Sequence, residues 1–242
     1  EEGVYIIKGS AKNCTIKVEA DDQAKVQLVL DGVSVTNDSA PAIYVVSADK
    51  CFVTTSSDSS LSVTGAFTAD GDTNTDAVIF SKDDLVLNGT AALTINSAQG
   101  NGVTGKDDVK VTGGTYNITS ALDSVEANDS IAVYDGTFNI SSSKDAFHSE
   151  NSEDDTVGFV YINGGTYTID AKSDSIQAVT QLQIDGGTFK LTSSEGLEAT
   201  SVQINDGTID ITASDDGINA SEGGNGKDAQ HYLYISITQY GK

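Results

Sequence analysis

The sequence predicts an all-β fold, a right-handed parallel β-helix in which a single-stranded solenoid has about 20–22 residues per coil. Two observations predict it. A segment of similar length and pattern recurs along the chain. Within each copy, apolar and polar residues alternate over short runs, and no longer stretch shows the period of a helix. One copy cannot bury its apolar face alone, so the copies are expected to stack on one another.

The repeat is clearest in five copies. They begin at Asp107, Asp129, Phe159, Gln181 and Ser201, and a looser copy begins at Asp83. The five starts are separated by 22, 30, 22 and 20 residues. The longest interval indicates an insertion, which contains the acidic run "SENSEDDTVG".

Each copy predicts three short strands and a glycine turn. The first strand alternates, as in Val109 and Val111, the second pairs an aromatic residue with an aliphatic one, and the third is only a few residues long. In register, the turn glycines form one column, which we assign to a corner that needs a positive φ or no Cβ: Gly114, Gly136, Gly165, Gly187 and Gly207. The aromatic residues form a second column, predicted to lie in the core: Tyr116, Phe138, Tyr167 and Phe189.

The solenoid is predicted to be one continuous domain, residues 1–242, without a linker. Residues 1–82 form diverged N-terminal coils, residues 83–221 the regular coils, and residues 222–242 a partial last coil. Cys14 and Cys51 each lie in a strand-like run and are expected to be buried free thiols. A disulfide between them is the alternative, and would fit an exported protein.

The formal net charge is −23, with 13 lysines and no arginine. Such a surface repels nucleic acid and anionic membranes. No apolar run approaches the roughly 18 residues that a membrane span needs. We therefore expect no nucleic-acid binding and no membrane insertion, and we expect a monomer. The same charge suits hard cations that prefer oxygen ligands.

One position in each coil is acidic or an amide. Aligning "DGINA" with the matching stretch of the other coils predicts this column: Asp76, Asn101, Asp123, Asp145, Asp174, Glu195 and Asp216. Three residues further on lies a second column: Thr104, Glu126, His148, Gln177, Glu198 and Asn219. Carboxylates stacked about 4.8 Å apart repel by roughly 3 kcal/mol per pair at an effective dielectric near 20. Raised pKa values or a bound cation would relieve that repulsion.

Oxygen ligands in such numbers favour Ca²⁺, and the absence of cysteine and of paired histidine from the column argues against Zn²⁺. The principal predicted set is Asp123, Glu126, Asp145 and Glu150, with Asp174 in the same column, and Glu198 with Asp216 forms a second set. Solvated turn residues are the alternative.

A separate acidic loop, "DGDTNTD", contains Asp70, Asp72 and Asp76. Its start resembles an EF-hand loop, but the loop lacks the glycine, the closing glutamate and the flanking helices. We predict a Ca²⁺-binding loop of another kind or a solvated loop.

The stretches "FSKDDLVLNG", "GKDDVKVTGG" and "DAFHSENSEDD…GFVYINGGTY" resemble secreted bacterial right-handed β-helix proteins described as carbohydrate-binding domain-containing, a polysaccharide-lyase-like family. The resemblance runs from about Asp70 to Ser221 and is poor over the first 65 residues. It implies a Ca²⁺-bearing solenoid, secreted or at the cell surface. It also implies binding of plant cell-wall polysaccharide, cellulose or acidic sugars such as polygalacturonate.

Two residues are candidates for catalysis. A lyase acting by β-elimination needs Ca²⁺ and an arginine or lysine base of lowered pKa. The chain has no arginine, and Lys144 and Lys172 are the lysines near the acidic column of the best-matched coils. The alternative is that both lysines are charge-balancing surface residues. His148 is interpreted as a polar turn residue rather than as a base. Acidic pairs that recur in every coil are typical of structure, so we predict a non-catalytic protein.

Two surfaces are candidates for sugar binding. Tyr134 and Tyr161 are predicted to point outward on adjacent coils, and Thr137 and Thr166 belong to an outward ladder of hydroxyl groups. Because the chain repels polyuronate, binding of acidic sugars is expected to depend on Ca²⁺. A Ca²⁺-dependent lyase and a passive cell-surface spacer remain alternatives.

Overall fold

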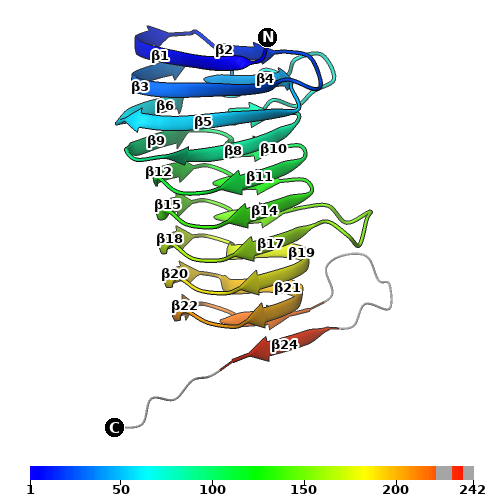
Figure 1. The fold of residues 1–242 in the computed structure, drawn as a ribbon. Helices are drawn as coiled ribbons and strands as arrows, with labels where there is room; N and C mark the ends of the chain where they lie inside the picture. Colours follow the sequence, from blue (N-terminus) through cyan, green and yellow to red (C-terminus); the bar gives the residue numbers. More distant parts are fainter. Residues whose placement is uncertain (222–230, 237–242) are drawn as a thin grey trace.

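A computed structural model describes residues 1–221 and 231–236, which form 24 strands and no helix. The chain winds as a parallel β-helix, and strands pair in parallel with the equivalent strands of the neighbouring coils (Figure 1). Each coil contributes strands to three faces of the solenoid. The predicted all-β solenoid is therefore confirmed. No described helix has the length and apolar character of a membrane span.

The first face carries the first strand of each coil. Its members are β1 (Gly3–Lys12), β3 (Lys25–Asn37), β5 (Lys50–Ser57), β8 (Asp84–Gly89), β11 (Asp108–Val111), β14 (Ser130–Val133), β17 (Phe159–Ile162), the C-terminal parts of β19 (Asp174–Ile184) and β21 (Glu195–Ile204), and β24 (Tyr232–Ile235).

The second face follows the glycine turn. It takes the C-terminal parts of β1 and β3, then β6 (Ser59–Val63), β9 (Ala92–Ser97), β12 (Thr115–Ser120), β15 (Thr137–Ser142), β18 (Thr166–Ala171), β20 (Thr188–Ser193) and β22 (Thr208–Ala213).

The third face closes each coil. It consists of β2 (Ile16–Glu19), β4 (Ile43–Ser47), β7 (Ala77–Ser81), β10 (Asn101–Gly105), β13 (Val125–Ala127), β16 (Phe147–Ser149), the N-terminal parts of β19 and β21, and β23 (Ile218–Ala220).

Stacked side chains fill the interior along the whole solenoid axis. Tyr116, Phe138, Tyr167 and Phe189 are at most 2% exposed, and the rings of Phe138 and Tyr167 stack with centroids 5.0 Å apart. The predicted aromatic core column is confirmed. All five glycines of the predicted corner column have a positive φ, between 110° and 146°. A side chain at Gly165 would also approach the carbonyl oxygen of Gly136 to 2.9 Å, so the corner requires glycine on both grounds.

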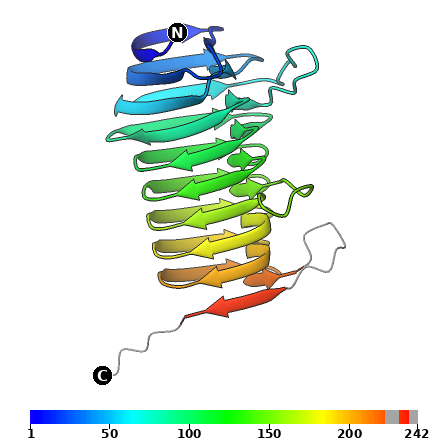
Figure 2. The same ribbon diagram turned by 45° about the vertical axis from the view of Figure 1, so that its right-hand side comes forward.

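The insertions leave the coils through loops. Residues 64–76 and 150–158 project from the same side of the solenoid in both views (Figure 2). The pairing of Thr137 with Thr166 makes the longest regular interval 29 residues, rather than the predicted 30, because β17 begins opposite Ser130.

Three details differ from the sequence interpretation. Several strands are longer than predicted, since β1, β3, β19 and β21 continue around a corner from one face to the next. Cys51 is buried as expected, but Cys14 is exposed in the turn after β1, and the two thiols are free. Of the predicted last coil, Tyr232–Ile235 pairs with β21, and residues 222–230 and 237–242 lie outside the described part.

Candidate functional site

A ladder of side-chain hydrogen bonds runs along the corner where the third face begins. We call Asn101, Asp123, Asp145 and Asp174 the corner ladder. The Oδ1 atom of Asn101 accepts the backbone N–H of Asp123 at 2.9 Å. In the same way Asp123 caps Asp145 at 2.9 Å, and Asp145 caps Asp174 at 2.8 Å. All four side chains are buried, so the predicted column has a structural role in addition to any other.

This ladder predicts that Asp145→Ala is destabilising and that Asp145→Asn is nearly neutral. Alanine leaves the buried N–H of Asp174 without a partner, which costs about 1–3 kcal/mol. Asparagine keeps the accepting oxygen, as Asn101 already does one rung earlier. Denaturant unfolding with chelator present measures the difference. Equal loss of stability in the two variants would contradict the ladder.

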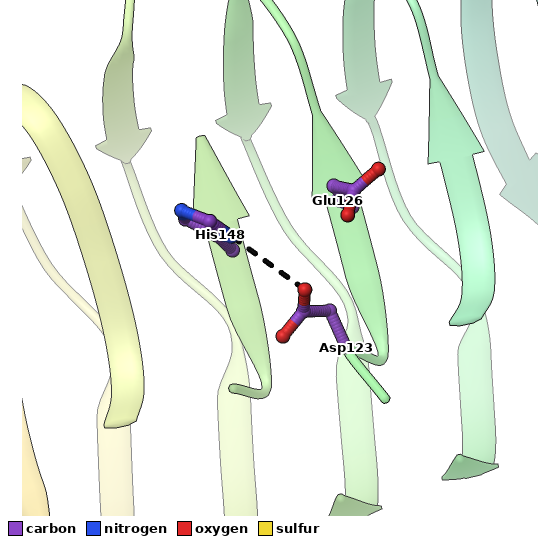
Figure 3. A group of neighbouring side chains, drawn as sticks. All are labelled: Asp123, Glu126 and His148. Atoms are coloured by element: carbon purple, nitrogen blue, oxygen red, sulfur yellow. Dashed lines mark ion pairs between the residues drawn. The ribbon is translucent and has the colours of Figure 1, made fainter. Parts of the chain in front are cut away.

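Next to the ladder lies a cluster that we call the first acidic group: Asp123, Glu126 and His148. Each offers one ligand atom within 4.8 Å of the other two. Glu126 lies on β13 and His148 on the adjacent β16, and both face Asp123 (Figure 3). His148 Nδ1 lies 3.5 Å from Asp123 Oδ2 and is buried without a hydrogen-bond partner.

Two lysines already balance the charge of this group. Lys144 Nζ donates to Asp123 Oδ2 at 2.7 Å, and Lys106 Nζ lies 3.6 Å from Glu126 and 3.3 Å from Glu150. Burial opposes ionisation of Asp123, but its interactions with His148 and Lys144 outweigh burial and lower the pKa of this carboxyl. The group is therefore an ion-paired network.

At two other carboxyls burial is not outweighed, and the pKa is raised. Burial and the charge of Glu150 raise the pKa of Glu126 to about 7. Burial, more than the nearby Asp123, raises the pKa of Asp145. Although burial alone would lower the pKa of His148, its interaction with Asp123 raises that pKa.

A second acidic group lies further along the solenoid: Asp174, Glu195 and Glu198. Their carboxylate oxygens also lie within 4.8 Å of one another. Burial and the neighbouring carboxylates raise the pKa of Asp174 to about 8. Within residues 1–221 and 231–236, no lysine forms an ion pair with this group. Its described polar contacts come from the amides of Gln177 and Asn219 and from Ser221.

The two groups fit Ca²⁺ unequally. The second acidic group presents three carboxylates and no positive charge, the ligand chemistry that Ca²⁺ prefers. In the first acidic group, an ion would stand close to the Lys144 ammonium. A divalent ion about 4 Å from it is repelled by about 8 kcal/mol at an effective dielectric near 20. Of the two groups, the second therefore has the ligand chemistry closer to that of Ca²⁺ sites.

The predicted metal ligands are only partly brought together. Asp123 and Glu126 meet as expected, but their third neighbour is His148. Asp145 Oδ2 is 4.0 Å from His148, and Glu150 is linked only through Lys106. Glu198 gathers with Asp174 and Glu195, whereas Asp216 is exposed at the end of the column.

The acidic loop before β7 does not gather its carboxylates. The predicted alignment of Asp76 with Asn101 is wrong by one residue, because Asn101 pairs with Ala77. The side chain of Asp70 accepts the hydroxyl of Tyr44 at 3.0 Å, and that of Asp76 accepts the amide of Asn74 at 2.6 Å. Asp72 is exposed. These contacts stabilise the loop itself.

Two members of the acidic groups were missed as candidate ligands. Glu195 stood in the predicted column and aligned with Asp174, so its pairing opposite Asp174 was a usable signal. His148 was interpreted as a polar turn residue. Its position opposite Glu126 was visible in the alignment, but its distance to Asp123 depends on how the corner folds.

The raised carboxyl pKa values predict that, in chelator, stability falls as the pH rises from about 5 to about 8. Folded Glu126 and Asp174 hold their protons up to about pH 7 and 8, whereas the unfolded chain releases them near pH 4. The pKa of His148 is also raised in the folded chain, so loss of its proton as the pH rises lowers stability in the same way. We expect a decrease of at least about 1.4 kcal/mol, the equivalent of one pKa unit. Thermal unfolding across this range tests it, and rising stability would contradict it.

The predicted tyrosines line a groove on the first face. The groove has a volume of about 290 Å³ and crosses strands β5 to β17. Tyr134 and Tyr161 meet at 69° with centroids 5.9 Å apart, so they form an angled wall rather than one flat platform. Lys110 Nζ lies 4.5 Å from the centroid of the Tyr134 ring. Ala132, on the strand between Lys110 and Tyr161, leaves room for the groove.

The predicted threonines lie on a different face. Thr137 and Thr166 are neighbours on β15 and β18 of the second face, both exposed. They belong to the regular hydroxyl ladder that the sequence predicts, around a corner from the tyrosine groove. The four predicted sugar-binding residues are therefore two adjacent pairs on separate surfaces.

Neither candidate base is prepared for proton abstraction. Burial alone would lower the pKa of Lys144, but its hydrogen bond to Asp123 raises that pKa, so Lys144 holds its proton. Lys172 is 70% exposed and pairs with Asp170 at 3.2 Å. A lyase base needs the reverse environment.

The chain is a carbohydrate-binding domain protein with a polysaccharide lyase-like β-helix fold. The chain belongs to the family of carbohydrate-binding domain-containing proteins, which matches residues 1–235. A relative of that description from Acetivibrio thermocellus is 32% identical over 120 residues, or 48% of this chain and 42% of the relative. The matched segment thus spans less than half of that protein.

A solved structure has the same architecture. It is the polysaccharide lyase-like protein from C. thermocellum, determined as a gadolinium derivative. The two chains are 26% identical, with a TM-score of 0.73 over 90% of this chain and 87% of the other.

Proposed function

We propose that this chain is a non-catalytic, Ca²⁺-binding protein that binds plant cell-wall polysaccharide outside the cell. The observation that carries the proposal is the second acidic group, with three close carboxylates and no described lysine beside them. Asp174, Glu195 and Glu198 would hold the ion. Ca²⁺ would supply positive charge able to hold a sugar carboxylate.

Two further observations support Ca²⁺. Burial, and after it repulsion by neighbouring carboxylates, raises the pKa of Asp174, and a cation would relieve that repulsion. The related C. thermocellum structure is a gadolinium derivative. Gadolinium is a hard cation that, like Ca²⁺, prefers oxygen ligands, so its use is consistent with hard-cation sites on this fold.

The experiment is retention on immobilised polygalacturonate, with Ca²⁺ or with chelator. The chain carries a net charge of −23 and repels polyuronate, so we expect retention only with Ca²⁺. The double variant Asp174→Asn, Glu198→Gln should lose it. Asp215→Asn, which removes an exposed acid from the same end of the solenoid, should not. Retention that survives chelation would overturn Ca²⁺ dependence.

The tyrosine groove is the proposed contact for neutral polysaccharide such as cellulose. Its aromatic walls supply stacking surface. At the end of the groove formed by β5 and β8, the charges of Lys50 and Asp84 cancel in an ion pair of 3.0 Å. Binding there would need no Ca²⁺. The exposed threonines of the second face offer hydroxyl contacts to a flat polysaccharide surface.

Tyr161→Ala is expected to weaken retention on insoluble cellulose by about tenfold, or about 1.4 kcal/mol. Tyr161→Phe keeps the ring and loses only the hydroxyl contacts to Asn163 and Asp185, so it should retain most binding. Pull-down at several protein concentrations measures the difference. The exposed Tyr5, at the N-terminal end, gives the matched control Tyr5→Ala. Equal effects of the Tyr161→Ala and Tyr5→Ala substitutions would contradict the assignment.

The lyase and spacer alternatives give different results in the same assays. Appearance of unsaturated product, followed by its absorbance, would support the lyase. Absence of both product and retention on either polymer would support the spacer.

A further inference from the structure

The two acidic groups occupy equivalent corners of the solenoid but differ in positive charge. Lys144 extends from the corner before Asp145 back to Asp123, where its Nζ lies 2.7 Å from Oδ2. Lys172 lies near the same corner of the next coil, two residues before Asp174 and so one position earlier than Lys144 in the register. Its Nζ instead contacts Asp170 and is 70% exposed.

We propose that Lys144 is a built-in counter-ion that keeps Ca²⁺ out of the first acidic group and confines it to the second. This inference rests on one part of the proposed function, namely that the acidic corner binds Ca²⁺.

The geometry of Asp123 carries this inference. Its Oδ1 accepts the backbone N–H of Asp145, so Oδ2 is the oxygen better placed to bind an ion. Lys144 already donates a hydrogen bond to that oxygen. Lys144 lies at the edge of the cluster, whose carboxylates Asp123 and Glu126 are buried. The unpartnered Nδ1 of His148 lies 3.5 Å from Asp123 Oδ2, and a carboxylate oxygen of Glu126 lies within 4.8 Å of both residues. Without the Lys144 ammonium group, Asp123 Oδ2 would lose its close lysine, and Lys106 would remain beside Glu126 only, at 3.6 Å.

Counting bound Ca²⁺ per chain by equilibrium dialysis tests the proposal. Native protein should bind an ion that Asp174→Asn removes and Asp123→Asn leaves in place. Lys144→Met should bind one ion more, and adding Asp123→Asn to that variant should remove the additional ion. Asparagine keeps the ladder bond, so this substitution tests charge rather than folding. Lys144→Arg, which keeps the positive charge, and Lys172→Met should both match native protein.

A second measurement uses the native chain and does not depend on whether the variants fold. Acylation of Lys144 and Lys172, quantified by peptide mass spectrometry, should be unchanged by Ca²⁺ at concentrations that saturate the native site. Faster acylation of Lys144 with Ca²⁺ would mean that the ion displaces it, which overturns the proposal. Loss of a native ion in Asp123→Asn, or an unchanged ion count in Lys144→Met, would overturn it as well.

Failure of the proposed function is separable from failure of this inference. If Lys144→Met gains an ion but no variant is retained on polygalacturonate, the counter-ion stands and acidic-sugar binding fails. If native protein is retained with Ca²⁺ and Lys144→Met gains no ion, binding stands and the counter-ion fails. Absence of bound Ca²⁺ in every variant would overturn both.

Discussion

Asp174→Asn is expected to abolish the stabilisation of this protein by Ca²⁺. An ion that binds only the folded chain adds about 2.7 kcal/mol at a concentration one hundred times its dissociation constant. For a chain of this size that raises the melting temperature by about 5–10 °C. Asp174 is the most buried member of the second acidic group, at 5% exposure, and loses a full ligand charge as asparagine. Calorimetry with Ca²⁺ and with chelator measures the shift.

The same substitution should leave the chelated protein nearly unchanged. The backbone N–H of Asp174 donates to Asp145 Oδ1. No described backbone N–H donates to the side chain of Asp174. Asp215→Asn is the control, because it removes one exposed charge outside both acidic groups. An undiminished Ca²⁺ shift in Asp174→Asn would mean that the ion binds elsewhere.

Phe138→Ala is expected to destabilise the protein by about 3–5 kcal/mol. Phe138 is 1% exposed and lies between the rings of Tyr116 and Tyr167, with centroid distances of 5.3 and 5.0 Å. The edge of Phe147 closes a third side at 5.4 Å. Truncation leaves a cavity that rigid neighbouring coils cannot fill. Denaturant unfolding measures the loss.

Phe138→Leu is the matched control. Leu93 occupies the same column opposite Tyr116, so the solenoid accommodates leucine at this position. We expect a loss clearly smaller than that of Phe138→Ala. A loss below about 1 kcal/mol for Phe138→Ala would contradict a tightly packed stack.

The fold could be predicted because its information is local and repeated. An alternating strand followed by a glycine corner occurs in each regular coil, so errors in one copy were corrected by the others. The glycines with positive φ and the buried aromatic column followed directly from this pattern. Where the pattern was interrupted the prediction slipped: Asp76 was misaligned by one residue beside the loop of residues 64–76.

The candidate site could be predicted only as far as its column. Register placed Glu126 opposite His148 and Asp174 opposite Glu195, so neighbours along the axis were accessible from the sequence. The sequence does not reveal whether a lysine or a metal ion neutralises each acidic group. That choice depends on side-chain direction: Lys144 turns back toward Asp123, whereas Lys172 turns out toward solvent. Lys144 directly precedes Asp145 and Lys172 lies two residues before Asp174, but this difference in spacing does not give the direction of either side chain.

The corner ladder gives the solenoid a chemical polarity. Asp123 and Asp145 each accept a backbone N–H from the following coil through the side chain and donate their own backbone N–H to the preceding coil. Removing a coil from the C-terminal side of a rung therefore exposes a carboxylate, which water solvates readily. Removing a coil from the N-terminal side leaves a backbone N–H without its acceptor. A coil carrying Asp or Asn at this corner brings both halves of the joint, so such coils can be duplicated or deleted as units during evolution.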